Sequence, residues 1–294
     1  MRNHPLPLIT SLAHGGLTTP PSVTQQLTID ATTIYNECDL WVEQLYDFAH
    51  ADLAPWIPAA GQPGVLASVT MPIARVLVDV NRDPDDLGQP DGPIKTMTSY
   101  GAPVYRKVPD EEQQQALLEA NWHPYHRALE AALRTHANGA KLLLDCHNMA
   151  QHGPAAYHFP GAARPLICLA NLGDAHGDPQ PRLGWTTCSG ELLRAAGAIA
   201  AELFADLALL EPTPGEAVPT VALNWPFAGG YIIQRYSQGT LTRPALPAMM
   251  IEVNRGLFVG DQTMNTSITA ANEPAIAQIR QRLYQWATRV AALL

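Results

Sequence analysis

The sequence predicts an α/β fold of three layers, in which a mixed, mostly parallel sheet is covered by helices on both faces. Apolar strand-like runs alternate with helical patterns along the 294 residues, as in folds built from strand–helix–strand units. The strand-like runs are apolar throughout, which is typical of strands buried on both sides. No internal repeat or low-complexity tract interrupts the chain, and we expect one domain over residues 1–294.

Five runs are predicted to be strands because they are short, apolar and rich in residues that favour extended backbone. They cover residues 6–13, 74–80, 141–145, 231–236 and 247–253. The first ends at a His-Gly-Gly turn, and the third continues into Cys146 and His147. These ends matter because ligands of open α/β sheets bind beyond the carboxyl ends of the strands.

Four segments are predicted to be helices from the spacing of their apolar residues. They cover residues 39–49, 111–136, 190–210 and 274–294. We expect Asp39 to cap the first helix, Pro124 to begin the latter half of the second, and Gly139 to end it. Residues 83–109 are rich in Pro, Gly and Asp, and we expect them to form a lid or binding loop.

Composition and charge exclude several classes of partner. A formal net charge of -9 argues against nucleic acid, whose phosphates require a basic face. It allows a small anion held by a few buried arginines. No stretch approaches the roughly 18–20 apolar residues of a membrane span, and no secretory signal is evident. The four cysteines form no CxxC pair, so we expect no thiolate zinc site. A long chain with few cysteines suits a reducing compartment. We expect a cytoplasmic protein without nucleic-acid or membrane partners, in an oligomeric state that the sequence leaves open.

Polar residues at the predicted strand ends point to metal-dependent hydrolysis. His14 and His147 follow two of these strands, Glu252 lies in the last, and the acidic residues Glu37 and Asp39 stand at a predicted helix start. Two histidines and a carboxylate, with one position left to water, form a known catalytic zinc set. Zinc would acidify that water and polarise an amide carbonyl. We predict a zinc site, with another divalent metal as the alternative.

Two carboxylates have competing interpretations. Asp145 lies two residues before His147, so both side chains share one face of a strand. It would hold a metal-bound imidazole in one tautomer, or else cap a loop. Glu252 follows an apolar run, where a carboxylate is costly to bury without a purpose. The alternative for Glu252 is an ion pair with Arg255 or Arg75.

Seven stretches of the chain resemble the N-formylglutamate amidohydrolases and occur in that family's order. They are His14-Gly15-Gly16, ECDLWVEQLYDFA (37–49), RVLVDVNRDPDD (75–86), PYHRAL (124–129), LLLDCHN (142–148), FAGGYI (227–232) and MIEVNR (250–255). The resemblance implies the zinc-hydrolase fold of the metallocarboxypeptidases and aspartoacylases, also called phosphorylase/hydrolase-like. It further implies hydrolysis of N-formyl-L-glutamate to L-glutamate and formate, as in histidine degradation, with a small anionic N-acyl amino acid as partner.

The resemblance also implies roles for individual residues. His14, His147 and a carboxylate would hold zinc. Asp39 matches the more constant acidic position of the family, and Glu37 remains a rival because related carboxypeptidases use a glutamate. Glu252 would be the general base, moving a proton from the attacking water to the leaving amine.

Arginines are the candidates for binding a substrate carboxylate, because a guanidinium group can take it with two parallel hydrogen bonds. Arg75 and Arg82 suit this role. We expect the strand over residues 74–80 to end before Asn81, so that Asn81 and Arg82 turn into the site. One of the two arginines would instead form an ion pair, with Asp79 as its partner.

Further candidates lie in the later motifs. His126 would assist proton transfer or hold the oxyanion, with a helix-surface position as the alternative. Gly229 and Gly230 would let the backbone approach a ligand, or form an ordinary bend. Tyr231 would contact substrate or pack, and Arg255 would contact substrate or hold the general base in place.

Four positions depart from the family pattern and bear on substrate recognition. They are Ala74, Asn148, Gln234 and Pro247. The predicted metal and general-base positions are unaffected. Two alternatives to the deformylase therefore stay open: a related zinc deacylase or carboxypeptidase-like hydrolase acting on another N-acylated acidic compound, and a non-catalytic metal-binding homologue.

Overall fold

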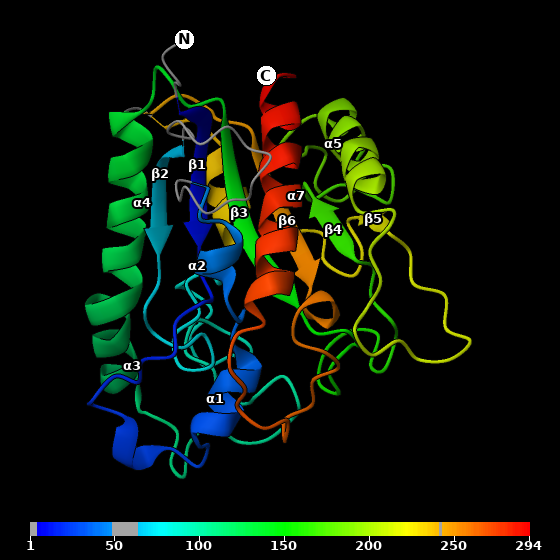
Figure 1. Cartoon of the computed structure of the whole chain (residues 1–294). Coiled ribbons are helices and arrows are strands. Elements are labelled where there is room, and N and C mark those ends of the chain that lie inside the picture. Colours follow the sequence, from blue (N-terminus) through cyan, green and yellow to red (C-terminus); the bar gives the residue numbers. More distant parts are fainter. Residues whose placement is uncertain (1–4, 49–63, 241–242) are drawn as a thin grey trace.

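Figure 1 shows the computed structural model, which describes residues 5–48, 64–240 and 243–294. A six-stranded sheet runs through it in the order β2-β1-β3-β6-β4-β5. The strands are β1 (Leu6–Leu12), β2 (Val65–Thr70), β3 (Leu142–Met149), β4 (Ile167–Ala170), β5 (Val221–Leu223) and β6 (Ala248–Asn254). Neighbouring strands are parallel except β4 and β6, which are antiparallel.

Helices cover both faces of this sheet (Figure 1). The helices are α1 (Ala31–Glu37), α2 (Val42–Leu45), α3 (Glu111–Leu117), α4 (His123–Thr135), α5 (Gly190–Leu203), α6 (Tyr231–Ser237) and α7 (Glu273–Ala291). One core lies between the sheet and α2, α5 and α7. The second lies between the sheet and α4 and α6. The predicted three-layer, mostly parallel α/β fold is confirmed.

The two cores explain why the central strands carry apolar residues on both faces. In β3, Leu142 and Leu144 belong to one core, whereas Leu143 belongs to the other. Successive side chains of a strand point to opposite faces of the sheet. A sheet with helices on both faces therefore needs apolar residues at odd and at even positions of its strands. Three predicted strands follow this rule and are confirmed as β1, β3 and β6.

The three long predicted helices are also present, with shifted ends. A π-helical segment, Leu118–Trp122, joins α3 to α4, and Pro124 lies in the first turn of α4. This helix ends at Thr135, ahead of Gly139. Helix α5 ends at Leu203 because Phe204 leaves the helical conformation, so the prediction of helix to residue 210 was too long. The C-terminal helix is α7.

The predicted strand over residues 74–80 is wrong. This segment is a buried loop with a helical turn, in which the backbone N–H of Val78 donates to the carbonyl of Ala74. Arg75 and Asp79 meet in an ion pair of 3.3 Å, a spacing that a turn allows and a strand does not. Its valines are buried in a core without pairing in the sheet. Burial, and not strand pairing, accounts for the apolar pattern.

Two other predictions fail for related reasons. Residues 231–236 form helix α6, whose buried residues Ile232, Ile233 and Tyr236 follow helical spacing. The helix predicted over residues 39–49 is only α2, and its N-cap is Trp41 in a left-handed conformation, so Asp39 does not cap it. The end of that prediction, from residue 49, lies outside the described residues. The sequence analysis also missed β2, β4, β5 and α1.

One edge of the sheet collects the polar residues. The carboxyl ends of β1, β3 and β6 point to the lower edge in Figure 1, where α1 and long loops gather. The predicted loop over residues 83–109 contains turns and isolated bridges but none of the named helices or strands. In the described part of the chain, no helix combines the length and apolar character that a bilayer crossing requires.

Candidate metal centre and active site

Three side chains from distant parts of the sequence converge at this edge. His14 follows β1, His147 lies near the end of β3, and Asp39 lies between α1 and α2. Asp39 Oδ2 is 3.0 Å from His147 Nδ1 and 3.6 Å from His14 Nδ1. One ligand atom from each residue falls within 4.8 Å of the others, and all three residues are buried. The predicted convergence of the two imidazoles is therefore present.

The other nitrogen of each imidazole meets a buried carboxylate. His14 Nε2 lies 2.8 Å from Asp79 Oδ1, and His147 Nε2 lies 2.9 Å from Asp145 Oδ2. Carboxylates at these positions orient the rings and leave both Nδ1 atoms to face Asp39. Asp145 has the position expected from its spacing to His147. Asp79, which was expected only as an arginine partner, lies against Nε2 of His14 and orients its ring in the same way.

This donor set fits a divalent cation. His14 Nδ1 is buried and has no hydrogen-bond partner among the described residues, although a buried polar atom normally has one. Two imidazole nitrogens and a carboxylate oxygen are the ligands that zinc takes in catalytic sites. Burial alone would lower the pKa of His147, but the Asp145 and Asp39 carboxylates hold that pKa well above its usual value. A cation at this point would take the place of the His147 proton.

Asp39 and Glu37 have different hydrogen-bond partners. This difference bears on which of the two carboxylates is the metal ligand, a choice that the sequence leaves open. Glu37 Oε1 accepts hydrogen bonds from the backbone N–H and the hydroxyl of Ser99, at 2.9 and 2.7 Å. Asp39 alone joins His14 and His147 in the cluster. Glu37 lies beside the same cavity without reaching the imidazoles.

A small cavity opens next to Asp39. Its volume is about 30 Å³. Glu252 lines it, and among the described residues no ion pair joins this carboxylate to Arg75 or Arg255. Burial raises the pKa of Glu252 to about 7, where a carboxyl group both accepts and releases protons near neutral pH.

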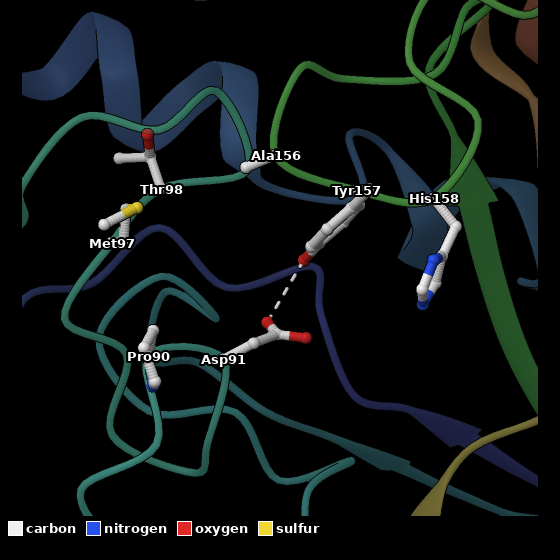
Figure 2. A pocket seen from close by; sticks show the side chains of 7 residues that line it. All are labelled: Pro90, Asp91, Met97, Thr98, Ala156, Tyr157 and His158. Atoms are coloured by element: carbon white, nitrogen blue, oxygen red, sulfur yellow. Dashed lines mark hydrogen bonds between the residues drawn. The ribbon is translucent and has the colours of Figure 1, made fainter.

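Tyr157 stands between this inner cavity and a larger outer pocket, since it lines both. The outer pocket has a volume of about 370 Å³. Figure 2 shows its lining, with the Tyr157 hydroxyl directed at Asp91, to which it donates a hydrogen bond of 3.4 Å. Asp91 belongs to the long loop over residues 83–109, so this loop lines the outer pocket; its role as a lid or binding loop stays a prediction.

The predicted substrate-binding residues divide into two groups. Arg75 and Arg255 line the inner cavity. Asn81 lies behind the imidazoles, where its side chain donates to Asp145 and accepts from the backbone N–H of Ile232. Arg82 turns away and pairs with Asp91 at 2.7 Å, so the structure does not bring it to the cavity.

Four other predicted residues support the site without lining the cavity. His126 is buried, with one ring nitrogen 2.9 Å from the Tyr236 hydroxyl and the other 2.9 Å from the carbonyl of Val80. Tyr231 packs beside it and accepts a hydrogen bond from Arg235. Both side chains lie on the side of α4 and α6, apart from Asp39.

The two glycines allow α6 to approach the site closely. A Cβ on Gly230 would lie 2.5 Å from the side-chain amide of Asn81. Gly229 has φ +142°, and a Cβ there would lie 2.5 Å from Ile233. Gly230 thus allows close packing against Asn81, and Gly229 allows close packing against Ile233.

Arg164 is a cavity residue that the sequence analysis missed. It lines the inner cavity together with Glu252 and is 3% exposed. It precedes β4, a strand too short to show a period, so no signal in the sequence marked it. Lys95, which is buried and forms an ion pair of 3.1 Å with Asp79, was also missed, because it lies in a loop without a periodic pattern.

An α/β sheet that gathers imidazoles and carboxylates at the carboxyl ends of its strands has its candidate site where ligands of such sheets bind, with side chains able to support metal-assisted hydrolysis. The chain belongs to the N-formylglutamate amidohydrolase family, whose sequence pattern matches residues 6–259. No curated protein matches the chain significantly.

Solved structures agree on the fold. An N-formylglutamate amidohydrolase from Ralstonia eutropha JMP134 superposes with a TM-score of 0.67 at 20% identity, over 99% of this chain and 95% of that one. A gene product from Agrobacterium tumefaciens gives a TM-score of 0.62 at 17% identity, over 97% of this chain and 90% of that one.

We predict that the buried His126 makes the folded protein less stable as the pH falls. Burial lowers its pKa to about 3, below the value of about 6.5 in an unfolded chain. The unfolded state therefore binds the proton first, and His126 should cost about 2 kcal/mol of stability between pH 7 and pH 5. Urea unfolding of chelator-treated protein at both pH values measures this loss.

The variant His126→Gln should lose less stability over that range than the parent chain. His136→Gln, at the half-buried end of α4, is the control and should match the parent. Equal acid sensitivity of the parent and His126→Gln would contradict the prediction.

Proposed function

We propose that this protein hydrolyses the formyl amide of N-formyl-L-glutamate, with zinc held by His14, Asp39 and His147. Family membership supports the substrate. The observation that carries the proposal is the partnerless, buried Nδ1 of His14, directed toward Asp39 beside the cavity that Glu252 lines. A cytoplasmic location and a single domain stay predictions from the sequence.

The protein contributes the position and charge of its ligands. Asp79 and Asp145 would accept hydrogen bonds from the Nε2–H groups of His14 and His147, which would hold both rings in the tautomer whose Nδ1 is free to bind the ion. When bound, the ion would polarise the amide carbonyl and acidify water. The buried carboxylate of Asp39 would offset part of the cation's charge.

Glu252 would move the proton. With a pKa near 7, its carboxylate form accepts a proton from the attacking water, and its acid form returns that proton to the leaving nitrogen. The C–N bond of the formamide breaks, giving formate and the free amine of glutamate. Burial keeps Glu252 away from bulk water, which would otherwise compete for this proton.

Arg75 would stabilise the developing negative charge. Its guanidinium lies 3.8 Å from Asp39 and 3.3 Å from Asp79, so it is held beside the cluster. A fixed cation at the cavity wall stabilises an oxyanion without reorganising during the reaction.

The first test is formate release. Protein of known metal content should release formate from N-formyl-L-glutamate, and faster than it releases acetate from N-acetyl-L-glutamate. Removal of metal by a chelator should abolish the activity, and zinc should restore it. Turnover of neither compound by zinc-loaded protein would contradict the proposal, and preference for the acetyl compound would indicate a related deacylase.

A pair of variants tests the carboxylate ligand. Asp39→Asn should weaken zinc binding at least roughly 100-fold, because it removes a charged ligand. Glu37→Gln should leave zinc affinity within about threefold, since its amide oxygen can still accept from Ser99. Zinc titration against a competing chelator measures both. The opposite order of the two variants would assign the ligand to Glu37.

Glu252→Gln tests the general base. The variant should keep a full complement of zinc while kcat falls roughly 1000-fold, because an amide cannot accept the proton. Glu202→Gln, on the surface at α5, is the matched control and should retain normal kcat. A Glu252→Gln enzyme within tenfold of the parent would remove this residue from the mechanism.

A further inference from the structure

Arg164 is a buried cation with an open hydrogen-bonding edge. Its Nε and Nη2 are buried and have no hydrogen-bond partner among the described residues. These two nitrogens lie on the same edge of the planar guanidinium, the edge that takes both oxygens of a carboxylate. Burial lowers the pKa of Arg164 to about 10, so the group is still charged at neutral pH. An unpaired buried charge of this kind is costly unless a ligand pairs with it.

The fold holds Arg164 at the cavity. Its backbone N–H donates to the carbonyl of Gln151 at 3.0 Å, and its own carbonyl accepts from the side chain of Asn254 at 3.0 Å. Phe227 lies against the guanidinium, 4.9 Å from ring centre to Cζ. A guanidinium that is fixed in this way loses little freedom when it binds a ligand.

The direction of β4 explains how this residue reaches the site. Strand β4 is antiparallel to β6, with Ile167 opposite Val253. The beginning of β4 therefore lies beside the end of β6, at the edge where the parallel strands finish (Figure 1). Arg164 lies three residues before β4 and so reaches the same cavity as Glu252.

The other two arginines of the cavity are already engaged. Arg75 faces Asp39 and Asp79. Nη1 of Arg255 donates to the carbonyl of Cys38 at 2.7 Å, although its Nε has no partner. Among the described arginines of the cavity wall, only Arg164 has a buried Nε and a buried Nη2 that both lack a hydrogen-bond partner.

We propose that the Nε–Nη2 edge of Arg164 binds a carboxylate of the substrate and so selects anionic N-acyl compounds. This inference rests on the proposed function, because it places the carboxylate of an N-acyl amino acid opposite the scissile amide. Arg164 is a binding residue in this arrangement, and Glu252 and the metal ligands act on the amide.

Binding of glutarate tests the inference without turnover. Calorimetry on zinc-loaded protein should show that Arg164→Gln weakens glutarate binding roughly 100-fold and Arg164→Lys roughly tenfold, because lysine keeps the charge but loses the paired hydrogen bonds. Arg194→Gln, a surface arginine paired with Asp178, is the control and should bind normally. Thermal unfolding confirms that each variant is folded, and Arg164→Lys carries the test if Arg164→Gln is not.

Kinetics then identify the specificity. N-formyl-L-glutamate is compared with its two monoamides, N-formyl-L-glutamine and N-formyl-L-isoglutamine. The parent enzyme should discriminate against the monoamide that lacks the bound carboxylate, and Arg164→Gln should abolish that discrimination through KM with little change in kcat. An equal loss on all three substrates would overturn the inference.

The two proposals fail in different ways. Arg164-dependent binding of glutarate without formate release would contradict the proposed function and support the carboxylate site. Formate release by a protein whose Arg164 variants bind glutarate normally would overturn the carboxylate site alone.

Discussion

The site depends on two carboxylates, Asp79 and Asp145, that have no exposed surface. A charge so deeply buried is tolerated only where other groups neutralise it. Each carboxylate contacts one nitrogen of an imidazole ring. Asn81 links the two carboxylates, because its backbone N–H donates to Asp79 and its side chain donates to Asp145. The loop that carries Asp79 is thereby fixed against β3. With one nitrogen of each ring held, the other nitrogens of His14 and His147 must face a common point.

Charge balance around the inner cavity would allow the proposed anionic ligand to bind to an acidic protein. Three carboxylates and three guanidinium groups line the cavity, although the whole chain carries a formal net charge of -9. A divalent cation beside Asp39 would leave this balanced wall with two excess positive charges, which a dianion compensates. The local arrangement, and not the net charge, determines what such a protein binds.

The sequence allowed the fold class, the central strands and the meeting of His14 and His147 to be predicted, because strands buried on two faces have a distinctive composition and carry their polar residues at their ends. The prediction of strands failed at residues 74–80, where a buried loop has the same apolar pattern as a strand. It also failed at β4, which is too short to show a periodic pattern. The carboxylate behind His14 and the open edge of Arg164 arise from contacts between distant segments, which no local pattern encodes.

Because β4 runs in the reversed direction, the proposed substrate-binding residue Arg164 comes from a different part of the chain than the proposed catalytic groups. The groups proposed to act on the amide belong to the ends of β1, β3 and β6 and to the turn before α2, whereas Arg164 belongs to the segment between β3 and β4. Changes in that segment can alter the shape and charge of the acid that is accepted while the imidazoles stay in place. If Arg164 binds the substrate carboxylate as proposed, substitutions in this one connection would change substrate preference without moving His14, Asp39 or His147.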